Sequence, residues 1–359
     1  MREIVKEGVK TVLRDFPLVS IVVLNWNGER VIRSSLDSIR KLDYPNKEVI
    51  VVDNGSKDTS VDIIRKEYRE FRLIENLKNL GFSAGMNVGI KESRGGLILL
   101  HNNDAFSHPT SLSLMVNTIL SRTKIGIVGG LILYHEPNDV IWSFGGKLDV
   151  LTGTIWSDGL GQKFYAGKNL KENEVTDIDY LSGCVLLIKR EVVQRIGLLD
   201  EESAVSGQDL DWCLKARRAG FECVLNPSAK IWHIGSYSLR HMPLRSYALR
   251  QESDFRVIML HFPLIPMFSA LLFQLLVTPI FELLFFGQSD VALRSRLKSR
   301  LYGFCENLKN VRNLLSRRRQ IAKLGVLRFK VRTFELLMFT IFRVSSKEFY
   351  MGRFLKRVE

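Results

Sequence analysis

Val19-Ser20-Ile21-Val22-Val23-Leu24 and Val49-Ile50-Val51-Val52-Asp53 are the two stretches that decide the fold. Each is a short run rich in β-branched residues, and the helix-like stretch Glu29–Leu42 separates them. The alternation continues with a helical stretch from Thr59 and the apolar run Leu97–Leu100. Strands that alternate with helices in this way are typical of βαβ units. The sequence therefore predicts an α/β fold with a mostly parallel, Rossmann-like sheet and helices on both faces.

The strand pattern extends into the second half of the chain. Further strand candidates are Ile125–Leu133 and Val140–Phe144. A second apolar run is Cys184–Ile188, and Ile231–His233 closes the electrically neutral part of the chain. Before Cys184–Ile188, the segment Gly145–Asn173 is rich in glycine and polar residues and is predicted to be a long loop, a kind of segment that is often functional.

Acidic residues stand where the apolar runs end. Asp53 follows Val49–Val52, Asp104 follows Leu97–Leu100, and Asp209 opens a helix-like stretch. The carboxyl ends of parallel strands converge on one crevice, where a divalent cation, a diphosphate and a hydroxyl nucleophile can be handled together. This layout predicts a sugar-nucleotide site.

Two interpretations of Asp53 stay open at this stage. It precedes Asn54-Gly55-Ser56, and a carboxylate at such a strand end can accept hydrogen bonds from a ribose or a base. The same four residues are also typical of an Asx turn with no ligand.

Asp104 ends the segment His101-Asn102-Asn103-Asp104 and is a candidate metal ligand. Mg²⁺ or Mn²⁺ takes oxygen ligands from one or two carboxylates together with substrate phosphates, and His233 is a candidate to complete the shell. The alternatives are a helix N-cap ahead of Pro109 for Asp104 and a purely structural role for His233.

Asp209 is the candidate general base for an acceptor hydroxyl. Ser206-Gly207-Gln208-Asp209 also resembles a capping box, which would give the carboxylate a local structural role. Asp209 and Asp211 point in different directions on a helix, so both are not needed for the cap, and Gly207 leaves room for a substrate.

The positive charge of the chain is a property of its C-terminal third. Residues 240–359 contain 22 Lys and Arg against 8 Asp and Glu, which is the whole net charge of +14. A basic segment of this kind favours an anionic partner, either membrane lipid or nucleic acid. Nucleic acid is disfavoured, because the basic residues are interleaved with Leu and Phe and follow a strongly apolar run.

That run, Val257–Phe286, contains three prolines and has arginines on both flanks. Its alternatives are an interfacial or re-entrant helical hairpin, which is favoured, a transmembrane span, or a buried core or dimer helix. The basic amphipathic stretch Leu314–Phe342 would then lie on anionic headgroups. The four cysteines form no CxxC pair, and residues 1–16 contain no signal-peptide run, so we expect a peripheral or re-entrant protein at the cytoplasmic face of the membrane.

Five motifs in register resemble the family 2 glycosyltransferases of the GT-A fold, most closely their rhamnosyltransferase-like branch. The resemblance covers about residues 17–250, so the predicted organisation is an N-terminal extension (1–16), a GT-A domain (17–250) and a membrane-association region (251–359). The motifs are Val19–Gly28, Val51–Ser56, Asn79–Asn87, Asn102–Asp104 and Gly207–Asp211.

The resemblance implies roles for individual residues. Asp209 would be the catalytic base of an inverting displacement, and Asp104 with His233 would bind Mg²⁺ or Mn²⁺. Two positions depart from the usual pattern, since Asn102 stands where an Asp is common and Gln208 replaces an acidic residue. The donor-binding residues would be Asn25, Asn27, Asp53, Asn54, Gly81, Asn87 and Asn103.

The expected reaction moves a sugar from a nucleoside-diphosphate sugar, of the dTDP-rhamnose or UDP-sugar type, to a hydroxyl of a lipid-linked or cell-surface glycan. One alternative is a polyprenyl-phosphate sugar synthase. Another is a non-catalytic membrane-binding protein with a degenerate transferase domain. A processive polysaccharide synthase is disfavoured, because a Gln-x-x-Arg-Trp motif is missing and one apolar segment cannot form a channel.

Overall fold

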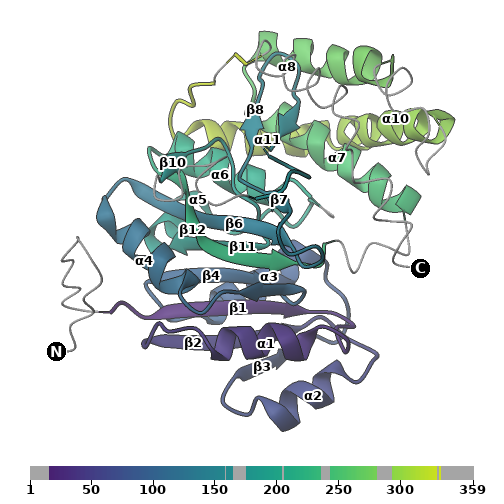
Figure 1. Cartoon of the computed structure of the whole chain (residues 1–359). Helices are drawn as coiled ribbons and strands as arrows, with labels where there is room; N and C mark the ends of the chain where they lie inside the picture. Colours follow the sequence, from purple (N-terminus) through teal and green to yellow (C-terminus); the bar gives the residue numbers. More distant parts are fainter. Residues whose placement is uncertain are drawn as a thin grey trace.

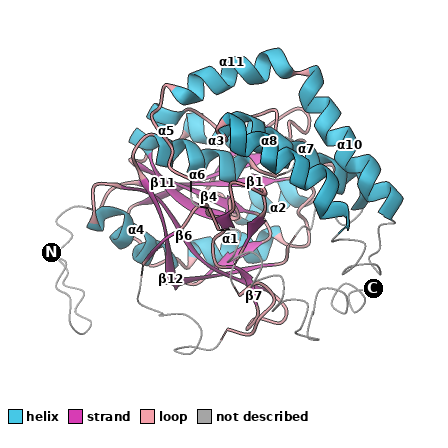
Figure 2. Ribbon diagram, turned by 90° about the horizontal axis from the view of Figure 1, so that it is seen from above, coloured by secondary structure: helices cyan, strands magenta, loops and turns pink. Residues whose placement is uncertain are grey.

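The computed structural model describes residues 16–157, 159–164, 175–203, 206–235, 243–280, 293–329 and 331–332. A ten-stranded mixed sheet runs through the molecule, helices cover both of its faces, and a layer of further helices lies at one end (Figures 1 and 2). The predicted α/β fold is confirmed. The predicted N-terminal extension, apart from Phe16, and residues 333–342 of the predicted amphipathic stretch lie outside the described residues.

The first half of the chain forms the parallel part of the sheet. Strand β1 (Val19–Asn25) lies between β2 (Lys47–Asp53) and β4 (Leu97–Asn102), and β3 (Arg72–Glu75) forms the edge. All three pairings are parallel, and the β1–β2 register sets Asn25 directly beside Asp53. The ends of these strands therefore deliver the predicted polar residues to one edge of the sheet.

Alternate residues of β1 point to opposite faces, as the period of a strand requires. Ile21 and Val23 pack against α1 (Ile32–Arg40), and the same core cluster includes residues of α2 (Ser60–Glu67) and α4 (Ser111–Ser121). Val22 belongs to the opposite cluster, with α3 (Phe82–Glu92), α5 (Arg190–Ile196) and α6 (Gln208–Arg218). The two layers hold the sheet between them.

The second half of the sheet is mixed. Strand β11 (Val185–Lys189) is antiparallel to both of its neighbours, β4 and β6 (Ile125–Tyr134). Beyond β6 lies β12 (Glu222–His233), a long strand that was not predicted. Its register shifts between Asn226 and Lys230, around Pro227, because proline lacks the N–H that an unbroken ladder needs.

Short strands complete the sheet and the loop beside it. Strand β5 (Ala105–Ser107) pairs with β12, β7 (Ile141–Ser143) with β6, and β10 (Thr176–Asp177) with β12. The predicted long loop Gly145–Asn173 contains a small hairpin, β8 (Lys147–Leu148) and β9 (Ile155–Trp156), and residues 165–174 lie outside the described part.

The last described elements are helical. They are α7 (Pro243–His261), α8 (Leu264–Leu272), the π-helix η2 (Phe273–Val277), α10 (Leu293–Lys309) and α11 (Val311–Ala322). Phe255 and Ile258 of α7 pack against Leu210 and Leu214 of α6, so this layer shares a core with the sheet domain. The predicted domain boundary at residue 250 lies inside α7. None of the described helices is long and apolar enough to cross a membrane.

Candidate active site

The ends of β1 and β2 form the first part of the site. Asn25 Nδ2 donates to Asp53 Oδ1 at 2.8 Å, and Ser56 Oγ donates to the same oxygen at 2.6 Å. Asp53 Oδ2 accepts from the backbone N–H groups of Gly55 and Ser56, at 3.1 and 2.9 Å. A carboxylate has about four acceptor positions, so the described residues already fill those of Asp53. The Asx-turn interpretation describes this geometry, and a nucleoside contact of Asp53 stays a prediction.

Asn27 lies in the loop that follows β1 and has left-handed backbone geometry, with φ of 49°. Its N–H donates to Ser56 Oγ at 2.9 Å, and its side-chain Oδ1 accepts from the N–H of Lys57 at 2.8 Å. The loops that follow β1 and β2 are thus fastened to each other next to Asp53.

Asn54 fastens the loop that leads into α3. The buried side chain donates to Asn79 Oδ1 at 3.0 Å and to the carbonyl of Gly81 at 3.1 Å, and it accepts from the N–H of Leu80. Gly81 has φ of 84°, and a Cβ at this position would meet no atom within 4 Å. The backbone at Gly81 therefore borders open space at the start of α3.

Asp104 and His233 come together as predicted. His233 ends β12, and its Nε2 lies 3.0 Å from Asp104 Oδ1, with both side chains buried. The Trp142 ring meets His233 edge-on at a centroid distance of 4.6 Å. Burial lowers the pKa of His233, but Cys184 and the Asp104 carboxylate outweigh that effect and raise it to about 10.

The donor atoms at this place fit a divalent cation that also binds a substrate diphosphate. Among the described residues no group of three or more His, Cys, Asp or Glu could hold a metal, so Asp104 and His233 would supply only part of a shell. Asn102 Oδ1 is buried and has no hydrogen-bond partner among the described residues, and hard cations prefer such oxygens. A metal ion at His233 would replace the ring proton, because a ligating imidazole is neutral.

Asp209 lies in the first turn of α6, after Gly207 in the left-handed conformation. Its Oδ2 accepts from the N–H of Gly183 at 3.0 Å, and its Oδ1 accepts from the N–H of Leu210 at 2.9 Å. Burial raises the pKa of Asp209, although the backbone N–H groups oppose the shift. The side chain is thus a half-buried carboxylate of increased basicity, which suits a general base.

Two adjacent residues, Gly183 and Cys184, connect Asp209 to the end of β4. Gly183 donates to Asp209, and the carbonyl of Cys184 accepts from the N–H of Asn102 at 2.9 Å. On the other side, Asn103 Nδ2 donates to Asn25 Oδ1 at 3.1 Å. The three predicted acidic positions, Asp53, Asp104 and Asp209, therefore belong to one continuous arrangement at one edge of the sheet.

Asn87 does not join this arrangement through its amide group. It is buried, and its Nδ2 donates to the carbonyl of Leu199 at 3.0 Å and to Glu201 Oε1 at 2.9 Å. Both amide hydrogens are thus used inside the protein. Asn87 was predicted to contact the sugar-nucleotide donor, but it has no free amide hydrogen for that contact. Its side chain instead holds the loop before α6.

Sequence reasoning missed residues that surround Asp209. A Cβ at Gly183 would lie 3.3 Å from the Cβ of Asp209, so this position leaves little room for a side chain. Asp254, on α7, has its pKa raised to about 6 by burial and by the charge of Asp209, while Arg300 and Arg250 oppose the shift. Position 254 carries no motif and lies 45 residues from Asp209 in the sequence.

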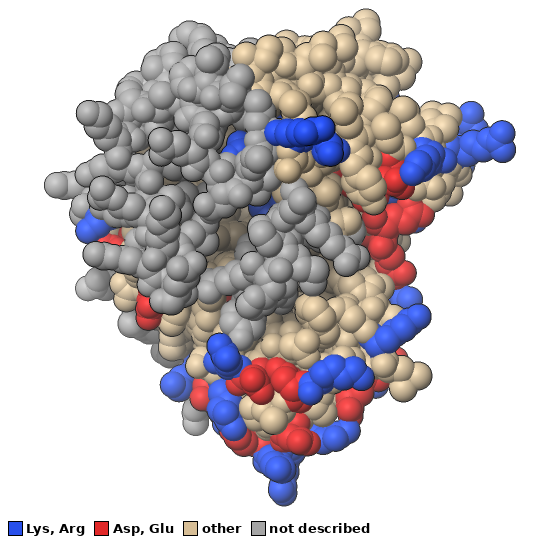
Figure 3. Space-filling model, turned by 90° about the vertical axis from the view of Figure 1, so that its right-hand side faces the viewer, with Lys and Arg blue, Asp and Glu red and all other residues tan. Residues whose placement is uncertain are grey.

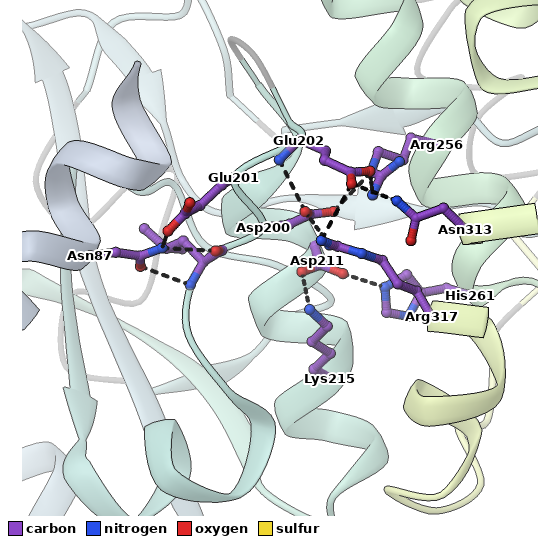
Figure 4. A network of polar contacts seen from close by, with 11 residues as sticks. Asn87, Asp200, Glu201, Glu202, Asp211, Lys215, Arg256, His261, Asn313 and Arg317 are labelled. Carbon is purple, nitrogen blue, oxygen red and sulfur yellow. Dashed lines mark hydrogen bonds and ion pairs between the residues drawn. The ribbon is translucent and has the colours of Figure 1, made fainter. Parts of the chain in front are cut away.

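Buried charged and polar side chains of α6 and α7 hold helix α6 in place (Figure 4). Asp211 pairs with Lys215 Nζ at 2.6 Å and with His261 Nε2, on α7, at 2.8 Å. Burial alone would raise the pKa of Asp211, but Lys215 and His261 outweigh it and lower the pKa to about 2. Asp211 therefore has a structural role, distinct from that proposed for Asp209.

A second ion cluster holds the loop between α5 and α6. Arg256 Nε donates to Asp200 Oδ2 at 2.8 Å, and its Nη2 lies 2.6 Å from Glu202 Oε2. Arg317 of α11 also pairs with Asp200 (Figure 4). The loop that leads to Asp209 is thus fixed to α7 and α11.

The fold is that of the GT-A glycosyltransferases. A solved structure with this architecture is a mannosyltransferase from Pyrobaculum calidifontis in complex with GDP-Man and Mn²⁺. It aligns with a TM-score of 0.51 and 15% identity, over 93% of this chain and 87% of the mannosyltransferase. At that identity the likeness concerns the fold alone.

Residues 20–197 match the sequence profile described as Glycosyl transferase family 2. An uncharacterized protein of Sinorhizobium fredii is 32% identical over 256 residues, which is 67% of this chain and 27% of that protein. An N-acetylglucosaminyl-diphospho-decaprenol L-rhamnosyltransferase of Mycobacterium tuberculosis is 24% identical over 224 residues, 58% of this chain and 73% of that enzyme. The chain belongs to glycosyltransferase family 2. It spans only 27%, 63% and 46% of the length of three relatives that it matches.

Replacing Asp211 by Asn should destabilise the protein by about 3 kcal/mol or more, because Lys215 would keep a buried charge with no carboxylate to balance it. Urea unfolding at pH 7 measures the change. The matched control is Asp62→Asn, on the exposed surface of α2, which should change the free energy of unfolding by less than about 0.5 kcal/mol. Equal effects of the two substitutions would contradict the structural role of Asp211.

Proposed function

We propose that this protein transfers a sugar from a nucleoside-diphosphate sugar to an acceptor hydroxyl in a single inverting displacement. The observation that carries the proposal is the continuous arrangement of Asp53, Asp104 and Asp209, connected through Asn25, Asn103 and the Gly183–Cys184 segment. In this proposal Asp53 marks the nucleotide side, Asp104 the metal side and Asp209 the base, all at the edge of the sheet where ligands of parallel α/β sheets bind.

The donor would bind across the ends of β1, β2 and β4. The loops that carry Asn27 and Asn54, the backbone at Gly81 and the amide of Asn103 would form that side. The side-chain amides of Asn27 and Asn103 would hydrogen-bond to the donor, whereas both amide hydrogens of Asn54 are used by Asn79 and Gly81. The proposed donor is of the dTDP-rhamnose or UDP-sugar type.

Asp104 and His233 would hold Mg²⁺ or Mn²⁺, with the oxygen of Asn102 nearby. A divalent cation bound there would neutralise charge on the departing nucleoside diphosphate. The complex of the mannosyltransferase with GDP-Man and Mn²⁺ supports this part of the proposal by analogy.

Asp209 would accept the proton of the attacking hydroxyl on the face of the sugar opposite the diphosphate. The hydrogen bonds from Gly183 and Leu210 orient its carboxylate, and burial increases its basicity. One displacement with one base inverts the anomeric configuration, and no enzyme nucleophile is needed.

The proposed acceptor is a lipid-linked or cell-surface glycan, and the proposed location is the cytoplasmic face of the membrane. The name of the M. tuberculosis relative, a rhamnosyltransferase acting on a diphospho-decaprenol sugar, favours this acceptor class. A polyprenyl-phosphate acceptor is the second candidate within the same fold. A non-catalytic protein is the third, and the departures at Asn102 and Gln208 are the residues that favour it.

Asp209→Asn should lower the rate of transfer by a factor of about 10² to 10⁴, because the amide cannot accept the acceptor proton. The measurement is the rate of nucleoside-diphosphate release in the presence of acceptor, with donor affinity determined separately by calorimetry. The control Asp62→Asn should retain the full rate. Normal turnover with Asn at position 209 would eliminate the proposed base.

Titration with UDP-, dTDP- and GDP-sugars should show heat of binding for one donor class, and Mn²⁺ should strengthen that binding. Asp104→Asn should remove most of the gain from Mn²⁺ while it leaves metal-free binding unchanged, because it removes the carboxylate ligand. If Mn²⁺ does not strengthen donor binding by the native protein, the metal site is contradicted. If no sugar nucleotide binds at all, the non-catalytic alternative is favoured.

The pH dependence of kcat/KM should show an acidic limb above about pH 4, the ordinary value for Asp, because burial raises the pKa of Asp209 and only its ionised form is a base. Activity should rise as the pH increases through that pKa. The measurement is kcat/KM at a series of pH values, and a kcat/KM that does not fall as the pH decreases would contradict the proposed base.

A further inference from the structure

Helix α8 and the π-helix that follows it expose a continuous apolar stripe. Leu264, Ile265, Phe268, Leu272, Leu276 and Ile280 are each between 57% and 83% exposed. In Figure 1 this helix forms the top of the molecule, and in Figure 2, which looks down from above, it lies in front of the other elements. The uppermost part of the surface in Figure 3, where it is not grey, carries no charged side chain.

The polar side chains of the same segment point into the protein. Ser269 Oγ donates to the carbonyl of Leu151 at 2.8 Å, and Gln274 Nε2 donates to the carbonyl of Thr152 at 2.9 Å. A helix on the surface of a globular protein normally shows the opposite arrangement, with its apolar stripe against the core. The outer face of α8 is therefore built for an apolar environment.

The π-helical turn keeps this stripe straight. Leu264, Phe268, Leu272, Leu276 and Ile280 are spaced by four residues, which is more than the 3.6 residues of an α-helical turn, so the stripe would drift around a regular helix. A π-helix has wider turns with i→i+5 hydrogen bonds, and residues four apart drift in the other direction. The change at Phe273–Val277 thus returns Leu276 and Ile280 to the outer face.

The chemistry of the stripe and its surroundings favours lipid as the occupant. The six side chains offer no hydrogen-bonding group, whereas protein interfaces normally carry about one hydrogen bond per 100–200 Å². Residues 264–280 contain no charged residue, and the sequence continues with Phe281, Glu282 and the apolar run Leu283-Leu284-Phe285-Phe286. On α10, exposed Arg294 and Lys298 flank exposed Leu297, a pattern in which basic side chains reach anionic headgroups while their neighbours contact hydrocarbon.

We propose that the outer face of α8 and η2 lies in the headgroup and acyl boundary of an anionic lipid bilayer, parallel to the membrane plane. The significance of this docking for catalysis rests on the proposed function. Ala270 and Leu271 of α8 share a core cluster with Leu210 and Leu214 of α6, the helix that carries Asp209. Docking through α8 therefore holds the base at a fixed short distance from the bilayer surface, where a lipid-linked acceptor would present its hydroxyl.

The test is flotation of the full chain with vesicles of phosphatidylglycerol and phosphatidylcholine, and with vesicles of phosphatidylcholine alone. The native protein should float with the anionic vesicles. Ile265→Glu with Phe268→Glu should reduce the bound fraction about tenfold, because it places two charges in the apolar boundary. Leu120→Glu, at an exposed apolar position on α4, is the matched control and should float normally.

Calorimetric titration of the same variants with the sugar nucleotide tests the proposed function separately from the docking face. Lost flotation with normal donor binding supports the docking face in a folded protein. Normal flotation of the double variant overturns the docking face, and so does a native protein that never floats but forms a dimer that the double variant abolishes. If the native protein floats but binds no sugar nucleotide, the docking face is supported and the proposed function is contradicted.

Discussion

The antiparallel pairing of β11 with β4 is the constraint on which the rest of the site depends. Because β11 runs against β4, the start of β11 lies at the carboxyl edge of β4, with Val185 opposite His101. Gly183 and Cys184 are thereby placed between Asp209 and Asn102, where their backbone groups bond to both. A parallel β11 would bring Lys189 to that edge, and the N–H of Gly183 could not reach the base.

The sequence predicted those features that depend on local pattern. The apolar runs of β1, β2 and β4 predicted the parallel core, and the polar residues after them predicted which edge of the sheet carries the site. The direction of β11 was not predictable, because a buried apolar run has the same composition in either direction. β12 was not predictable for a different reason. Pro227 lies in its middle, and a proline argues against a strand when the sequence is considered alone.

Individual roles were harder to predict than positions, because a role depends on what else touches the side chain. Asp53 was expected at the strand end and is there, but Asn25 and Ser56 occupy its oxygens. Asn87 was expected beside the donor, and both of its amide hydrogens are used by residues more than a hundred positions away. Asp104 and His233 were expected close together and are in contact, because Asp104 lies two residues after β4 and His233 ends β12 at the same edge.

The buried ion pairs argue against a C-terminal region that is only a detachable anchor. Asp211 is satisfied by His261, and Asp200 by Arg256 and Arg317, so removal of α7 and α11 would leave two buried carboxylates short of partners. An unpaired buried charge costs several kcal/mol, a large part of the stability of an ordinary domain. Helices α7 and α11 therefore complete the core behind Asp209, and α7 also shares a core cluster with α8, the helix that we propose to meet the membrane. A substitution that changes the packing of α7 would therefore affect both the docking face on α8 and the position of Asp209 on α6.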